Sequence, residues 1–98
     1  MTITRKQDGT NLTIALKGRL DTLTAPELEN ELKESLEGID SLELDFWKLD
    51  YISSAGLRVL LSAHKSMQGK GVMKITHVNE IVREVFDVTG FLDILTIE

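Results

Sequence analysis

Residues 49–58 read LDYISSAGLR, and over these residues an apolar, strand-like run gives way to a helical pattern. The change predicts that Ser53 and Ser54 lie at the start of a helix. A helix N-terminus leaves backbone N–H groups without partners and carries roughly half a positive charge, so it accepts a capping hydroxyl or an anion. The serine pair is therefore either a plain helix cap or a place where phosphate is added and removed.

Two neighbours of the serine pair favour the second interpretation. Gly56 stands in the first turn of the helix, where glycine costs about 1 kcal/mol relative to alanine, which indicates that another group approaches closely there. Arg58 follows Ser54 by four residues on the same helical face, where it could neutralise a phosphate. The plain cap stays open as the alternative, because capping is the commonest reason for serine at a helix start.

The rest of the chain alternates between strand-like and helical periodicity. Alternation of apolar and polar residues predicts strands at residues 2–6, 11–17, 41–46, 73–76 and 94–97. Helical spacing of apolar residues predicts helices at residues 25–37, 54–68 and 80–90. Thr24 and Glu27 fit a capping box at the first of these helices, and Asn79 fits a cap of the last.

The predicted order of elements is β-β-α-β-α-β-α-β, and strands that alternate with helices indicate right-handed βαβ units with parallel neighbours. Asp8-Gly9 is a turn signal, so the first two strands form a hairpin. Parallel strands covered on both faces are continuously apolar. These strands instead carry polar residues at alternate positions: Thr13, Glu43, Asp45, Lys74 and Thr76. We therefore expect an α/β fold with a mixed sheet and helices mainly on one face, rather than a doubly wound nucleotide-binding topology.

The composition predicts one ordinary domain over residues 1–98, because 98 residues with 42% hydrophobic content suffice for a single core. A formal charge of −5 argues against a nucleic-acid-binding surface, which would be basic. The chain has no cysteine, which excludes disulfides and thiolate metal sites and fits a reducing compartment. No signal-peptide pattern opens the chain, and no segment reaches the ~18 apolar residues of a membrane span. We expect a cytoplasmic protein without membrane insertion.

Catalysis by either serine would need a base within hydrogen-bond reach. His64 follows Ser54 by ten residues in the same predicted helix, which is about 15 Å of helical rise. His77 follows a strand, and no G-x-S-x-G elbow accompanies it. Asp45 and Asp50 lack a clustered third acid, so they are weak support for a metal site, and no glycine-rich phosphate loop occurs. We expect no catalytic residue, no metal and no cofactor.

The segment Ser54-Ala55-Gly56-Leu57, preceded by Asp50-Tyr51-Ile52, resembles the signature of the STAS domain, the fold of bacterial anti-sigma factor antagonists in partner-switching systems. Gly18-Arg19-Leu20-Asp21 matches the Gly-x-Leu-Asp of that family, and residues 85–91 are similar to its third helix and the turn after it. The resemblance covers nearly the whole chain. It departs from the family pattern in two places: Ser53 stands where an aspartate is usual, and a further C-terminal helix has no counterpart after Glu98.

The resemblance implies a regulatory cycle. In the family, the unphosphorylated antagonist binds an anti-sigma factor that is also a serine kinase, and the sigma factor is freed. The kinase then phosphorylates a serine of the antagonist and expels it, and a PP2C-type phosphatase restores it. Alignment on Gly56 and Leu57 places the phosphorylated serine at Ser54, with Ser53 as the competing site.

The resemblance also implies which residues surround or shape the partner-binding surface. These are Asp21, Asp50, Ser53, Gly56, Leu57 and Arg58. Asp21 has an equally favoured role as a cap or turn acid before the first helix. The alternative function is a phosphate-independent STAS scaffold, a subunit of a transporter or signalling complex, which the missing aspartate at position 53 favours.

Overall fold

The elements of the protein follow one another in the predicted order up to the last strand. The computed structural model describes residues 1–98. The elements are β1 (Thr2–Asp8), β2 (Asn11–Leu20), α1 (Ala25–Ser35), β3 (Ser41–Ile52), α2 (Ser54–Met67), β4 (Val72–Thr76), α3 (Glu80–Val88) and the short 3-10 helix η1 (Phe91–Asp93). The strands lie side by side in the order β1-β2-β3-β4. The first pair is antiparallel and the other two pairs are parallel, which confirms the mixed sheet.

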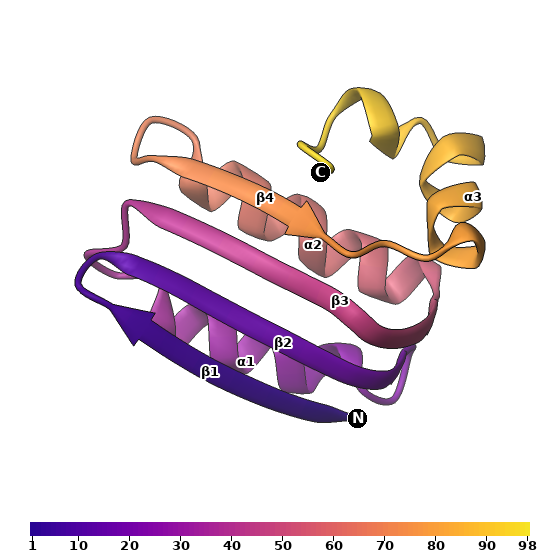
Figure 1. Ribbon diagram of the computed structural model, residues 1–98, viewed down its shortest axis with the longest axis horizontal. Coiled ribbons are helices and arrows are strands. Elements are labelled where there is room, and N and C mark those ends of the chain that lie inside the picture. Colours follow the sequence, from indigo (N-terminus) through magenta and orange to yellow (C-terminus); the bar gives the residue numbers. More distant parts are fainter.

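Both long helices, α1 and α2, cover the same face of the sheet, and α3 lies at one end of it, near the end of β3 (Figure 1). Inward-pointing strand residues and the apolar stripes of the helices form a single core. Its fully buried members include Leu12, Ile14, Leu16, Leu28, Leu42, Leu44, Phe46 and Leu60. The polar residues at alternate strand positions stay partly exposed on the opposite face. The prediction of a sheet covered on one face is therefore confirmed.

Strand β3 is longer than predicted and contains two irregularities. Its pairing with β2 steps from Ala15↔Asp45 to Lys17↔Lys48, and again from Gly18↔Leu49 to Arg19↔Tyr51, so β3 has an extra residue each time. Such bulges shift the inward positions of a strand. The buried residues Phe46, Leu49 and Ile52 are accordingly three apart, and Trp47 and Lys48 are both exposed.

The predicted strand at residues 94–97 is wrong in its extent. In its place the chain forms η1 and then a single parallel bridge, Ile75↔Ile97. The N–H groups of Ile94 and Leu95 both donate to the carbonyl oxygen of Phe91, at 3.1 and 2.8 Å. Because these donors are used inside the turn, they are not free to extend the sheet.

The two predicted helix caps have different outcomes. The capping box is wrong, because the Thr24 side chain makes no cap bond and its hydroxyl donates to the carbonyl of Arg19 at 2.8 Å. Asn79 caps α3 as predicted: its Oδ1 accepts from the Val82 N–H at 2.8 Å. Its Nδ2 also donates to the Leu49 carbonyl at 2.8 Å, which ties α3 to β3.

Candidate functional site

Ser54 is the first residue of α2, and it is exposed. Strand β3 ends at Ile52, and the extended backbone of Ser53 (φ −102°, ψ 176°) turns the chain into the helix. The Ser53 carbonyl accepts the first helical hydrogen bond, from the Leu57 N–H at 3.0 Å. The Ser54 hydroxyl therefore stands in solvent at the positive end of a helix of 14 residues, where an anion is tolerated.

Ser53 has a different environment from its neighbour. Its N–H donates to the Leu20 carbonyl at 2.9 Å, while its Oγ is buried and has no hydrogen-bond partner. It makes no side-chain cap bond to the helix, so the plain cap interpretation is wrong for this residue. An enzyme can reach the Ser54 hydroxyl from solvent, whereas the Ser53 oxygen would first have to leave the interior.

Gly56 lets the first turn of α2 rest directly on the ends of two strands. A Cβ atom at this position would lie 2.8 Å from Leu20 Cγ and 2.8 Å from Ile52 Cγ1. The predicted close approach is therefore confirmed, and the approaching groups are core side chains. Leu57 is also buried, at 5% exposure. These two residues support the surface around Ser54 from beneath.

Asp21 organises the turn between β2 and α1. Its Oδ1 accepts from the backbone N–H groups of Leu23 at 3.0 Å and Thr24 at 3.1 Å, and its Oδ2 lies 3.9 Å from Nε of Arg19. The hydrogen bond from the Thr24 N–H is the largest of several effects that lower the pKa of the Asp21 carboxyl below its ordinary value. The predicted role as a turn acid is therefore correct. The turn displays Leu23, whose side chain is 87% exposed.

The Asp21 turn and the start of α2 border a common depression of about 230 Å³. Thr22 and Pro26 line it from the first side, and Ala55 and Arg58 line it from the second. Arg58 is exposed and has no ion-pair partner. The structure thus brings Arg58 next to the segment that Asp21 holds, although the two are far apart in the sequence.

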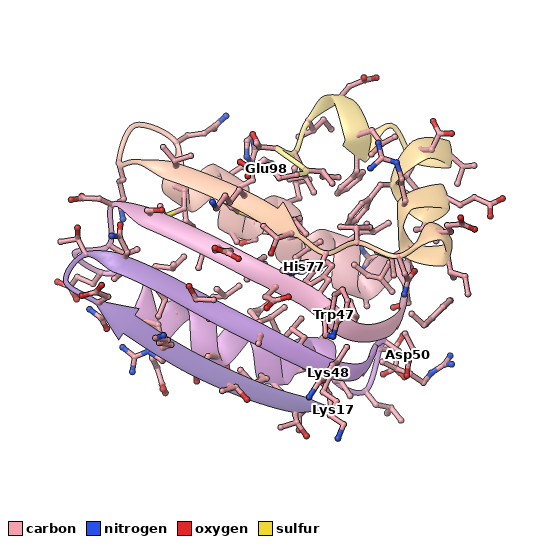
Figure 2. The ribbon with its side chains drawn as sticks, viewed as in Figure 1. Lys17, Trp47, Lys48, Asp50, His77 and Glu98 are labelled. Carbon is pink, nitrogen blue, oxygen red and sulfur yellow. The ribbon has the colours of Figure 1, made fainter.

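The end of β3 completes this surface. Asp50 is the extra residue of the second bulge and projects at the end of the sheet (Figure 2). Next to it, the guanidinium of Arg19 stacks over the Tyr51 ring at 4.5 Å.

Neither this stacked pair nor the exposure of Leu23 was predicted from the sequence. The available signal was an apolar residue inside an otherwise polar turn, which by itself does not distinguish a buried from an exposed side chain.

The two histidines lie away from Ser54. His64 belongs to the last turn of α2, whereas Ser54 begins that helix. His77 is on the open face of the sheet, where its Nδ1 is 2.9 Å from Oδ1 of Asp45. No three His, Asp or Glu side chains come together in a group that could hold a metal ion. None of the helices combines the length and the apolar character needed to cross a lipid bilayer.

Known proteins are similar to this chain over most of its length. The STAS domain family model matches residues 2–98. BtrV of Bordetella bronchiseptica, named as a candidate anti-sigma factor antagonist, is 40% identical over 88 residues, which cover 88% of this chain and 76% of that protein. The anti-sigma-B factor antagonist of Bacillus subtilis is 28% identical over 93 residues, covering 94% of this chain and 85% of that protein.

Among solved structures, an anti-sigma factor antagonist from Mycobacterium paratuberculosis superimposes with a TM-score of 0.89 at 18% sequence identity. The match covers 98% of this chain and 83% of that one, so the two share the complete sheet and helix arrangement. The family match over nearly every residue agrees with the sheet order and the one-sided helices. The chain belongs to the STAS domain family.

Proposed function

We propose that this protein is an anti-sigma factor antagonist that binds an anti-sigma factor with serine-kinase activity and is released when Ser54 is phosphorylated. The observation that carries the proposal is the difference between the two serines. Ser54 offers its hydroxyl to solvent at the first residue of α2, while the Oγ of Ser53 is buried. The protein acts by binding, in the cytoplasm, and a PP2C-type phosphatase returns it to the binding form.

The charge of a phosphate explains why binding would be lost while the fold survives. Phosphorylation adds about 1.5–2 negative charges at pH 7. The N-terminus of α2 and the unpaired Arg58 nearby are favourable surroundings for that charge in the free protein. A partner seated on Ser54 would remove the water around the same charge, and this loss of solvation is costly unless the partner supplies a positive group of its own. The complex therefore dissociates, and the domain stays folded.

The proposed docking surface consists of the start of α2, the Asp21 turn and the end of β3. Ser54, Arg58 and Asp50 face solvent and can touch a partner, as can the exposed Leu23. The other residues act by holding these in place. Asp21 fixes the turn through its hydrogen bonds. Ser53, whose Oγ is buried, and the buried Gly56 and Leu57 fix the position of the helix start against the sheet.

Mass spectrometry of the intact protein tests the proposal. After incubation with ATP and the cognate kinase, the wild-type protein should gain about 80 Da, the mass of one phosphoryl group. The Ser54→Ala variant should gain nothing, while Ser53→Ala should be modified like the wild type. Phosphorylation of Ser54→Ala but not of Ser53→Ala would transfer the switch to Ser53 and overturn the assignment.

The alternative is a constitutive scaffold, favoured by the serine at position 53 in place of the usual aspartate. A scaffold would bind its partner with unchanged affinity in the presence of ATP and an active kinase. Its mass would also stay unchanged under those conditions. Binding that persists without any mass gain therefore supports the scaffold and contradicts the phosphorylation cycle.

A further inference from the structure

The open face of the sheet, opposite the helices, contains a cleft of about 330 Å³. It lies across β1, β2 and β3 at the end of the sheet where β1 begins. The residues that form it include Thr2, Thr4, Ala15, Lys17, Trp47 and Lys48. Its volume is at the lower end of the range for small-molecule sites. The cleft is separate from the surface around Ser54, which lies on the helix side of the sheet.

The first bulge of β3 builds this cleft. Because two residues of β3 stand opposite one of β2, Trp47 and the adjacent Lys48 both reach solvent, and the Trp47 side chain is 72% exposed. Bulges are enriched beside active and binding sites, where they redirect a side chain. An exposed indole next to a floor residue as small as Ala15 leaves a flat apolar wall and room for a ring beside it.

Two lysines at the cleft have no counter-ion in the protein. Lys17 and Lys48 are direct register partners on neighbouring strands, a position in which like charges repel. Neither forms an ion pair, although Lys74 on the same face pairs with Glu43 at 3.9 Å and with Glu98 at 3.8 Å. Figure 2 shows both lysines beside Trp47 at one end of the sheet. Other cations of the chain, Arg58 among them, are also unpaired, but Lys17 and Lys48 stand opposite each other in register and line the same cleft.

Asp45 and His77 both contact Trp47 on the open face of the sheet. Asp45 also lines the cleft, and its Oδ1 accepts a hydrogen bond from the backbone N–H of Trp47 at 3.0 Å and lies 2.9 Å from Nδ1 of His77. The His77 ring meets the indole edge-on, with 5.3 Å between the ring centroids. His77 has a φ of 57°, the only positive value outside glycine, and such strained residues are concentrated at functional sites. The Asp45 carboxylate is therefore paired with His77 and forms no ion pair with Lys17 or Lys48, so both lysines are available to an anionic ligand.

We propose that this cleft binds a small organic anion made of a flat ring and a carboxylate or phosphate group. The ring lies over Ala15 against the indole of Trp47, and the anionic group lies between Lys17 and Lys48. The ligand supplies the negative charge that the lysine pair lacks and the apolar surface that the indole lacks. The site stands independently of the phosphorylation cycle, because none of its residues belongs to the surface around Ser54.

Tryptophan fluorescence gives a direct test, because Trp47 is the single tryptophan of the chain. Two probes carry a ring and an anion: adenosine monophosphate for the phosphate form and benzoate for the carboxylate form. Adenosine and benzamide carry the ring alone, and inorganic phosphate and acetate carry the anion alone. We expect a saturable fluorescence change with at least one of the first two probes. The matching neutral probe should bind about tenfold more weakly, since one charge-assisted contact is worth about that factor.

A charge-matched pair of variants locates the binding. Lys17→Gln combined with Lys48→Gln should weaken binding of the responsive probe about tenfold or more. Lys6→Gln combined with Lys70→Gln removes the same charge outside the cleft and should bind like the wild type. Trp47→Ala has no tryptophan fluorescence, so calorimetry measures its binding. This variant should bind the responsive probe more weakly, because the contact between the probe ring and the indole is lost. No saturable change with any probe, equal binding of neutral probes or of the anions alone, or an equal loss in the control pair would each overturn the proposal.

Discussion

Gly56 of α2 lies against Leu20 of β2 so closely that a Cβ atom at Gly56 would come within 2.8 Å of the leucine Cγ. This contact joins the two segments that carry the family resemblance, which are separated by more than thirty residues in the chain. Leu20 directly precedes Asp21, and Gly56 follows Ser54 by two residues. The turn that Asp21 holds and the start of α2 are therefore set by one packing contact, and neither can move without the other.

Replacing Gly56 by alanine should destabilise the domain. The added methyl group overlaps Leu20 and Ile52, both of which are almost completely buried. Overpacking of this kind costs about 1–3 kcal/mol, and the better helix propensity of alanine offsets about 1 kcal/mol of it. For a domain of this size, each 1 kcal/mol lost lowers the melting temperature by about 4–8 °C. Thermal unfolding followed by circular dichroism measures the change.

Ser62→Ala is the matched control for this substitution, because it adds no atoms on the exposed side of the same helix. Its melting temperature should stay within about 4 °C of the wild type, since exposed substitutions of this kind change stability by at most about 0.5 kcal/mol. A Gly56→Ala protein as stable as the control would show that Leu20 and Ile52 yield without cost, and that the packing contact is not tight.

Placing a carboxylate at Ser54 should separate binding from stability. In Ser54→Asp the charge lies at the positive end of α2, where acids are favourable by about 0.3–1 kcal/mol, so the melting temperature should hold or rise slightly. Binding of the anti-sigma factor should be lost, because the charge would be buried in the complex. Calorimetric titration measures the binding. Ser54→Ala removes the hydroxyl without adding charge and should bind like the wild type. Wild-type affinity in Ser54→Asp would contradict the proposed switch.

Removing the buried hydroxyl of Ser53 should not harm the fold. Its Oγ has lost water and gained no hydrogen-bond partner, so Ser53→Ala relieves a desolvation cost of about 1–3 kcal/mol. The lost packing of one oxygen is small. We expect chemical denaturation to give equal or higher stability than the wild type, by up to about 3 kcal/mol. A destabilised Ser53→Ala protein would indicate that the hydroxyl has a partner, such as an ordered water molecule.

Sequence patterns were sufficient for the order of elements and the exposed polar face, because both follow from periodicity within single segments. They were insufficient for strand register. Alternation in β3 stops at Phe46. Although the residues from Leu49 to Ile52 are strand-like, nothing at Trp47 and Lys48 distinguishes the end of one strand from a bulge within a longer one. The exposure of Trp47 and its position beside Lys17 depend on that bulge. The cleft could therefore be found only once neighbouring strands were aligned.

The serine site shows the same division between local and tertiary information. The position of Ser54 at a helix start was correctly predicted, because it depends on the change of periodicity in one segment. The burial of the Ser53 hydroxyl depends on how α2 seats against β2, and the exposure of Leu23 depends on how Asp21 closes its turn. Thr24 was predicted as a cap from its spacing, yet its hydroxyl bonds the preceding strand instead. Side chains at such turns have several local partners, and tertiary packing selects among them.

The Asp21 turn should contribute to stability in a pH-dependent way. The backbone N–H of Thr24, followed by those of Leu23 and the Thr24 hydroxyl, lowers the pKa of the Asp21 carboxyl in the folded state. Its unfolded pKa is about 3.9. As the pH falls below that value, the unfolded chain takes up the proton first, so this contribution is complete at neutral pH and is lost as the pH passes through the folded pKa. Asp21→Asn should therefore be less stable than the wild type at pH 7, and the difference should shrink below about pH 4.

Asp40→Asn is the control, because it removes the same charge from an exposed side chain that makes no hydrogen bond or ion pair. The change in unfolding free energy of Asp40→Asn reports the effect of net charge alone. Subtracting this change from that of Asp21→Asn leaves the contribution of the hydrogen bonds in the turn. Unfolding midpoints in denaturant at several pH values between 3 and 7 give both differences. If the corrected difference stays constant over this range, the Asp21 carboxylate is not held by the Thr24 and Leu23 N–H groups. The turn that displays Leu23 would then be ordered by its packing alone, and Asp21→Asn would leave partner binding intact.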